Sequence, residues 1–159
     1  LFKNYKNKAT KIIRPFNLYG DHMKKNDNRI IPRFISQAVN NENITVFNKG
    51  EQTRSYCNID DAVIMIKNIC LEGKSFVYNV GNMNEEITAN ELAKKILETV
   101  PNTKSKIVKI DYPKEYPKNE PMRRCPNIDK YYEEFKEKPT IDLKTGLYNF
   151  YQYAKKNWK

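Results

Sequence analysis

Short apolar or β-branched segments alternate along this chain with longer segments whose apolar residues recur at helical spacing. The expected strands cover Thr10–Arg14, Ile44–Phe47, Thr53–Cys57, Phe76–Val80 and Lys106–Ile110. The expected helices cover Ile30–Val39, Asn58–Gly73, Ala89–Thr99, Ile128–Phe135 and Asp142–Lys156. Such alternation is typical of the α/β class. The near-continuous apolar run Phe76–Val80 suits a parallel strand that is covered on both faces.

Capping residues indicate where two of these helices begin. Asn58 is a good N-cap, and Asp60 and Asp61 follow in the first turn, where the helix dipole favours anions. Thr88 followed by Glu91 fits a capping box. Elsewhere we expect residues 1–8 to be the end of a helix and residues 17–28 to be a loop. Residues 111–126 hold four prolines and are expected to be extended or irregular.

The chain is strongly basic, with 29 Lys and Arg against 19 Asp and Glu and a net charge of +10. Such a charge permits nucleic-acid binding. The lysines are scattered, however, and no basic stripe with interleaved aromatics is present. We therefore favour a solvated basic surface, with an anionic small-molecule ligand as a second contributor, and we expect no nucleic-acid partner.

No apolar run approaches the roughly 18 residues that a membrane span needs. Lys3, Lys6 and Lys8 interrupt the region where a signal peptide would be apolar. These features predict a soluble, cytoplasmic protein without a membrane partner.

Three cysteines and one histidine limit the possible metal and disulfide chemistry. Cys57, Cys70 and Cys125 form no Cys-x-x-Cys pair and are odd in number, which argues against a disulfide framework and a zinc site. We expect buried free thiols and no metal. His22, the sole histidine, is expected to have a surface role.

Three short segments could carry a binding site: Arg14–Gly20 (RPFNLYG), Gly50–Asp61 (GEQTRSYCNIDD) and Pro121–Pro126 (PMRRCP). Asn17 follows a strand, where ligands of α/β sheets bind, but it could also merely turn the backbone. Arg54 could hold a diphosphate through its planar fork. Taken alone, it could equally be a surface residue that pairs with Glu51 or Asp61.

Together, the order and spacing of these segments resemble the C-terminal half of the extended short-chain dehydrogenase/reductases that act on nucleotide sugars. This is the NAD-dependent epimerase/dehydratase family, including UDP-glucuronate decarboxylases and dTDP-glucose 4,6-dehydratases. The resemblance runs from about Lys11 to Phe150 and departs from the family at Asp21-His22, where a Gly-Pro loop is commoner. It implies the last part of a Rossmann-type parallel sheet (residues 1–20 and 58–82) plus a small mixed α/β substrate-binding subdomain (residues 21–57 and 83–159), without the N-terminal cofactor half.

The resemblance also implies roles for individual residues. Asn17 would contact the phosphate region of a UDP- or dTDP-linked sugar, and Arg54 and Arg124 would grip the diphosphate. Arg123 would face solvent or support them. The residues expected to contact the nucleotide base are Ile31, Phe34, Val46 and Phe47. Those expected to pass near the nicotinamide are Pro15 and Phe16.

The cofactor loop and the catalytic pair of the family are not expected in this chain. Its five glycines lie too far apart for a dinucleotide loop: Gly20, Gly50, Gly73, Gly81 and Gly146. Tyr-x-x-x-Lys occurs at Tyr132/Lys136 and Tyr151/Lys155, but the family's pair would lie upstream of Asn17. We therefore assign both pairs to structure and expect no catalytic residue and no NAD binding by this chain alone.

In the longer parent enzyme, NAD would oxidise the sugar at C4 to a 4-keto intermediate, and the enzyme could be a homodimer. The alternative is a non-catalytic or regulatory protein that keeps the nucleotide-sugar pocket. A basic nucleic-acid-binding module is a third, disfavoured possibility. Without the rest of the sheet, we expect Ile12–Ile13, Val63–Ile66 and Val77–Val80 to lose apolar cover, which predicts marginal stability or association.

Overall fold

The computed structural model describes residues 10–114 and 120–158, so the helix end expected at residues 1–8 lies outside the described residues. The helices are α1 Ile30–Val39, α2 Ile59–Glu72, α3 Ala89–Thr99, α4 Asp129–Phe135 and α5 Leu143–Asn157. The strands are β1 Ile12–Pro15, β2 Leu18–Tyr19, β3 Ile44–Phe47, β4 Thr53–Arg54, β5 Cys57–Asn58, β6 Val77–Val80, β7 Ile87–Thr88, β8 Ile107–Ile110 and β9 Arg123–Arg124.

The described strands form four small sheets, most of them parallel. β1 pairs with β6, β2 with β5, and β3 with β8, each in parallel. The fourth sheet has the order β7-β4-β9, in which β4 is antiparallel to β7 and parallel to β9. This arrangement confirms the predicted α/β class.

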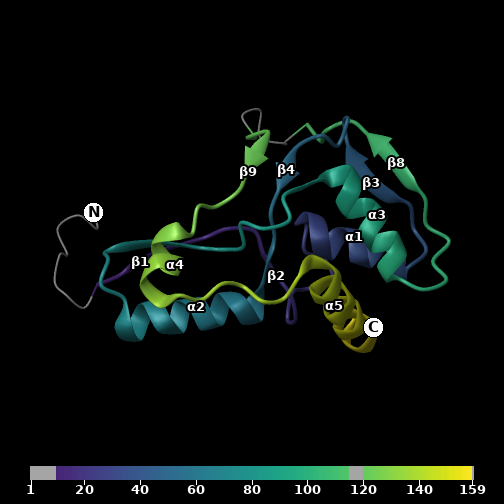
Figure 1. Cartoon of the computed structure of the whole chain (residues 1–159). Helices are drawn as coiled ribbons and strands as arrows, with labels where there is room; N and C mark the ends of the chain where they lie inside the picture. Colours follow the sequence, from purple (N-terminus) through teal and green to yellow (C-terminus); the bar gives the residue numbers. More distant parts are fainter. Residues whose placement is uncertain (1–9, 115–119, 159) are drawn as a thin grey trace.

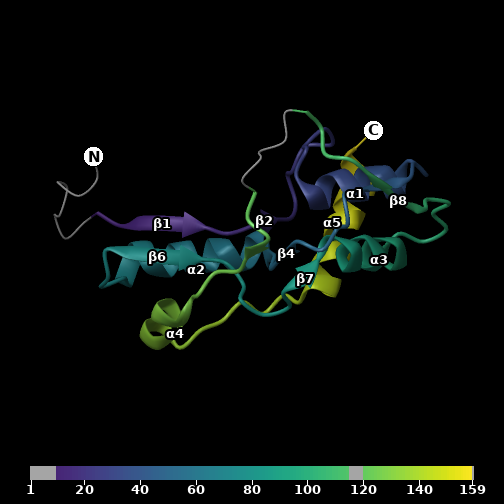
Figure 2. The same cartoon turned by 90° about the horizontal axis from the view of Figure 1, so that it is seen from above.

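The elements gather into two groups, each around its own apolar cluster. Figures 1 and 2 both show α2, α4, β1 and β6 on one side and α1, α3, α5 and β8 on the other. In the first group, Met65 and Ile69 of α2 join Tyr78 of β6 and Tyr131 of α4. α4 thus packs on the side of residues 58–82, although it belongs to the range 83–159. The predicted division into a sheet remnant and a substrate-binding subdomain stays a prediction.

The second cluster fills the space between three helices and β3. Its fully buried members include Phe34 of α1, Ile44 of β3, Leu92 of α3, and Leu147 and Phe150 of α5. The apolar residues of each helix recur at three- and four-residue intervals, so one face of each is buried. This group forms the larger core and carries one wall of the cavity described below.

A buried carboxylate joins the two groups. Asp61, in the first turn of α2, is 4% exposed. It accepts hydrogen bonds from the backbone N–H of Thr140 (3.0 Å), the Thr140 hydroxyl (3.1 Å) and the backbone N–H of Ile141 (2.9 Å). These donors lie just before α5, so Asp61 fixes where the last helix begins relative to α2.

Local capping signals predicted the helix starts well. The Asn58 side chain accepts a hydrogen bond from the Asp60 N–H at 2.9 Å. Thr88 and Glu91 form the expected capping box. The strand expected at Thr53–Cys57 is instead divided into β4 and β5, because β4 pairs with β7 and β9 whereas β5 pairs with β2. β2 itself lies in the segment that was expected to be a loop.

The outer face of α2 is apolar and exposed. Val63, Ile64 and Leu71 are 55%, 52% and 71% exposed. This agrees with the expected loss of cover along Val63–Ile66. The expectation was wrong for Tyr78 and Val80, which are buried in the smaller apolar cluster.

The cysteines differ from the expectation of three buried thiols. Cys57 is buried, but Cys70 is exposed and Cys125 is half-buried, because Cys70 lies on the outer face of α2. Burial raises the pKa of the Cys57 thiol to about 12. Within the described ranges, no cluster of His, Cys, Asp or Glu could hold a metal. No described helix is both long and apolar enough to cross a membrane.

Candidate functional site

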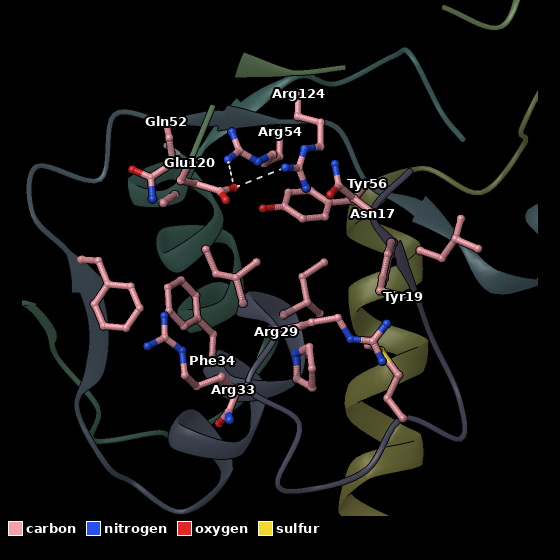
Figure 3. A pocket seen from close by; sticks show the side chains of 18 residues that line it. Asn17, Tyr19, Arg29, Arg33, Phe34, Gln52, Arg54, Tyr56, Glu120 and Arg124 are labelled. Carbon is pink, nitrogen blue, oxygen red and sulfur yellow. Dashed lines mark hydrogen bonds and ion pairs between the residues drawn. The ribbon is translucent and has the colours of Figure 1, made fainter. Parts of the chain in front are cut away.

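A cavity of about 280 Å³ lies between the start of α1 and strands β4 and β9. Figure 3 shows polar and charged side chains entering it from several elements. The predicted site residues that line it are Asn17, Ile31, Phe34, Phe47, Arg54 and Arg124. The structure therefore brings together residues that are far apart in the sequence.

Arg54 is the most tightly held polar residue of the cavity, and it is only 8% exposed. Its guanidinium donates to a Glu120 carboxylate oxygen at 2.5 Å and to the Pro121 carbonyl at 2.8 Å. It also donates to the carbonyls of Thr53 (2.7 Å) and Met122 (3.3 Å). The partner is thus Glu120 rather than Glu51 or Asp61. Arg54 consequently ties the segment before β9 to β4.

The two arginines of β9 differ in their surroundings. Arg124 lines the cavity, its side chain is 44% exposed, and its Nη2 lies 3.7 Å from Oε1 of Glu120. Arg123 is 68% exposed and pairs with Glu86 at 2.7 Å, and it does not line the cavity. Hydrogen bonds from Thr53 and Arg123 lower the pKa of Glu86. Arg123 is therefore solvent-facing, as predicted.

An aromatic surface closes another side of the cavity. The Arg33 guanidinium lies 4.2 Å from the centroid of the Phe47 ring, a cation–π contact. Tyr112 packs on Phe47 at 5.6 Å between ring centroids. Phe34 is fully buried at the cavity floor. Phe47 is half-buried, so it is the aromatic side chain that stays partly accessible on this side of the cavity.

Val46 does not line the cavity. Alternate residues of a strand point to opposite faces. Ile44 and Val46 are fully buried in the larger core, whereas Phe47 is only half-buried. The two neighbours were predicted together as base contacts, and the structure brings only Phe47 to the cavity.

Asn17 combines two roles that the sequence left open. Its φ of +42° places it in the left-handed region, so it turns the chain after β1. Its side-chain amide also donates to the Ser55 carbonyl at 2.9 Å, and the residue lines the cavity. Asn17 thus holds β1 against the segment that carries Arg54.

Pro15, the last residue of β1, and Phe16, which follows it, do not line this cavity. The glycines do not fit a cradle for dinucleotide phosphates: Gly81 faces Phe16 and Pro126, and Gly20 faces Ile59. At these two positions of the described chain, side chains fill the space beside the glycine that a phosphate group would need.

Two lining residues that the sequence analysis did not select have chemistry suited to a ligand. Glu120 is the one carboxylate among the described residues of the cavity wall. Tyr56 is 8% exposed, and Figure 3 shows its ring projecting into the cavity. Burial raises the Tyr56 pKa, so its hydroxyl stays protonated and can donate. Residues two positions apart in an extended segment point to the same side, so the selection of Arg54 could also have indicated Tyr56.

Further positive charge comes from the rim. Arg29 and Arg33 also line the cavity, and Arg29 is paired with Asp27 at 2.5 Å. That ion pair lowers the pKa of Asp27. The described wall carries four arginines and one carboxylate, with the Asp27 carboxylate paired beside it, a balance of charge that attracts anions.

The two Tyr-x-x-x-Lys pairs lie outside the cavity. Tyr132 is 39% exposed, with Lys138 Nζ 4.2 Å from its ring centroid and Lys136 Nζ 5.9 Å away. Tyr151 is 6% exposed and belongs to the core of α5. Neither pair lines the site, which agrees with their assignment to structure.

Comparison with known proteins identifies relatives of this arrangement. The model of the NAD dependent epimerase/dehydratase family matches residues 2–81. UDP-glucuronic acid decarboxylase 6 of Arabidopsis thaliana is 34% identical over 138 residues, which are 86% of this chain and 38% of the relative. UDP-glucuronic acid decarboxylase 1 of Danio rerio is 30% identical over 145 residues, or 90% of this chain and 33% of the relative.

Solved structures share the fold. UDP-glucose 4-epimerase of Thermotoga maritima, determined with UDP-glucose, superposes with a TM-score of 0.83 at 22% identity, covering 94% of this chain and 47% of that one. UDP-glucuronic acid 4-epimerase of Bacillus cereus, in complex with UDP-glucuronic acid and NAD, gives 0.80 at 25% identity, covering 98% and 48%. The chain thus spans less than half the length of each of these relatives.

Proposed function

The chain belongs to the NAD-dependent epimerase/dehydratase family, and on that premise we propose that it is the nucleotide-sugar-binding part of a longer enzyme. That enzyme would oxidise a UDP- or dTDP-linked sugar at C4 with NAD, and epimerisation, dehydration or decarboxylation would follow through the 4-keto intermediate. The observation that carries the proposal is one cavity with Arg54 and Arg124 on one side and Arg33, which rests on the Phe47 ring, on the other.

The arginines suit the diphosphate of such a ligand. Arg124 is half-exposed and directed at the cavity, so it can make charge-assisted bonds to phosphate oxygens. Arg54 positions Arg124 indirectly, because it donates hydrogen bonds to the Pro121 and Met122 carbonyls just before β9. Remote binding energy of this kind positions the reacting sugar carbon, even though the chemistry occurs elsewhere.

The opposite end suits a pyrimidine base. The planar Arg33 guanidinium, held over the Phe47 ring, offers a surface on which a base can stack, and backbone groups at the start of α1 can reach the edge of the base. A volume of about 280 Å³ is at the lower limit of small-molecule sites. It suits the diphosphate and base, so the sugar would extend beyond the described wall.

Oxidation by NAD would depend on residues outside this chain. When bound, the cofactor supplies hydride acceptance at the sugar carbon. Pro15 and Phe16 are the residues of this chain proposed to pass near its nicotinamide. On its own the chain is expected to be inactive. A cytoplasmic location and a homodimeric parent remain predictions.

Calorimetric titration with UDP, TDP, GDP and NAD tests this proposal. We expect one pyrimidine diphosphate to bind and NAD to give no heat. Replacing Arg124 by Ala should weaken binding about 10- to 100-fold, because a hydrogen bond to a charged group contributes about 1.5–3 kcal/mol. Arg123→Ala is the matched control, since the same residue type is removed one position away and outside the cavity.

Three results would count against the proposal. Equal losses in Arg123→Ala and Arg124→Ala would indicate a non-specific charge effect. Equal binding of GDP would remove the pyrimidine assignment. A folded chain that binds no nucleotide, but binds single-stranded nucleic acid with strong salt dependence, would favour the nucleic-acid alternative.

A further inference from the structure

The carboxylate of Glu120 lies between two guanidinium groups. Its Oε1 is 2.5 Å from Nη2 of Arg54 and 3.7 Å from Nη2 of Arg124. Figure 3 shows both interactions converging on the same side chain at the cavity wall. One oxygen that faces two arginines is the arrangement that a phosphate oxygen would adopt there.

The remaining bonds of Arg54 make Glu120 the replaceable partner. Its guanidinium donates to the carbonyls of Thr53, Pro121 and Met122, which are backbone groups of β4 and of the segment just before β9. Glu120 is its one charged partner among the described residues. A ligand anion can therefore reach Arg54 by taking the place of Glu120 while the three carbonyl bonds stay.

The position of Glu120 permits such a replacement. Its side chain is 25% exposed, against 10% for Arg54, so the displaced carboxylate can be rehydrated at the rim. A carboxylate left in place would repel an incoming anion within a partly desolvated cavity, where charge interactions are stronger than in water. The charge of the ligand must therefore offset the loss of the ion pairs that Glu120 makes with Arg54 and Arg124.

We propose that Glu120 is a specificity-determining residue that acts as an internal competitor for the diphosphate. This inference rests on the proposed function. A diphosphate can engage Arg54 and Arg124 with different phosphoryl groups and so replace both contacts of Glu120. A monophosphate has only one phosphoryl group, so it replaces less of the interaction that Arg54 and Arg124 lose when Glu120 is displaced. Glu120 therefore favours nucleoside diphosphates over monophosphates.

The test compares Glu120→Gln with wild type by calorimetric titration of UDP, UMP and inorganic pyrophosphate. The variant should bind UDP and pyrophosphate about tenfold tighter, and the UDP-to-UMP affinity ratio should fall. Glu86→Gln is the matched control, because Glu86 also pairs with an arginine of β9 and has a similar side-chain exposure of 24%. It makes the same change in net charge outside the cavity and should alter each affinity less than twofold.

Thermal melting of each variant checks that it is folded, and Glu120→Asp provides a second test that keeps the charge. The shorter carboxylate cannot span both arginines, so its affinities should fall between those of wild type and Glu120→Gln. Unchanged or weaker pyrophosphate binding in Glu120→Gln would overturn the inference, as would a control that tightens binding equally. If pyrophosphate binds more tightly to the variant while UDP binds no better than pyrophosphate, Glu120 competes as proposed and the nucleotide assignment fails.

Discussion

Removing the Asp61 carboxylate should destabilise the chain more than any other single change to an acidic side chain of α2. Asp61→Ala leaves the N–H groups of Thr140 and Ile141 without the acceptor that they have at 3.0 and 2.9 Å. A hydrogen bond to a charged group contributes about 1.5–3 kcal/mol. The Thr140 hydroxyl adds little, because Thr140 is exposed and its hydroxyl can turn to water.

Two donors at about 1.5 kcal/mol each give a loss near 3 kcal/mol in the free energy of unfolding. For a chain of this size, about 2–4 °C is lost per kcal/mol, so the melting temperature should fall by about 6–12 °C. Asp61→Asn should lose about half as much, because its Oδ1 can still accept from Thr140 while its amide would oppose the Ile141 N–H.

Urea and thermal denaturation followed by far-UV circular dichroism at pH 7 measure these differences. Asp60→Asn is the control: Asp60 shares the first turn of α2 but is exposed, so only its dipole interaction of about 0.3–1 kcal/mol is at stake. An Asp61→Ala variant within 1 kcal/mol of wild type, or an Asp60→Asn variant equally destabilised, would refute the reasoning.

Four further predictions concern the cavity and the thiols. Tyr56→Phe removes one hydroxyl from the cavity and should weaken UDP binding about 3- to 10-fold, as one hydrogen bond of about 0.5–1.5 kcal/mol would; unchanged affinity in calorimetry at an unchanged melting temperature would show that the hydroxyl meets no ligand atom. Arg54→Ala should lower the melting temperature as well as the UDP affinity, because Arg54 holds three carbonyls, whereas Arg124→Ala should lower the affinity alone; equal melting temperatures would contradict this structural role. At pH 8 an aromatic disulfide reagent should modify exposed Cys70 rapidly and Cys57 only on unfolding, and rapid modification of two thiols in Cys70→Ser would be the contrary result. Burial raises the Cys57 pKa from 9.0 to about 12. The protonated thiol therefore contributes its full stability below pH 9, and this contribution should be lost as the pH rises from 9 towards 12. In urea denaturation over that interval, Cys57→Ser should lose less free energy of unfolding than wild type, and equal losses in the two proteins would contradict this assignment.

Signals that lie within a few residues of one another predicted the structure best. The bounds of α1 and α3 follow from apolar spacing and, for α3, from the Thr88–Glu91 capping box. Such contacts are local, so they can be read from the sequence directly. The division of Thr53–Cys57 between two sheets depends on partners far along the chain, at β2, β7 and β9, and no local pattern specifies them.

The same distinction applies to the cavity. Asn17, Arg54 and Arg124 were selected from motifs, and the structure brings all three to one wall. The orientation of Val46 away from that wall depends on the strand register. Glu120 is important because the fold places it between Arg54 and Arg124, and Tyr56 because the fold places its ring at the cavity. Their roles could not follow from residue type alone.

The parallel pairing described for β1 has a consequence for how the chain is made. Ile12 pairs with Val77 and Pro15 with Val80, so β1 leaves the ribosome long before its partner exists. A loop that contains α1, β3 and α2 must close before this sheet can form, and such non-local pairing is slow. Until residues 77–80 have been synthesised, β1 therefore lacks the β6 strand with which it pairs. A co-translational chaperone that covers strand edges would be needed at the edge of β1 that β6 later occupies, rather than at α5, whose hydrogen bonds are local.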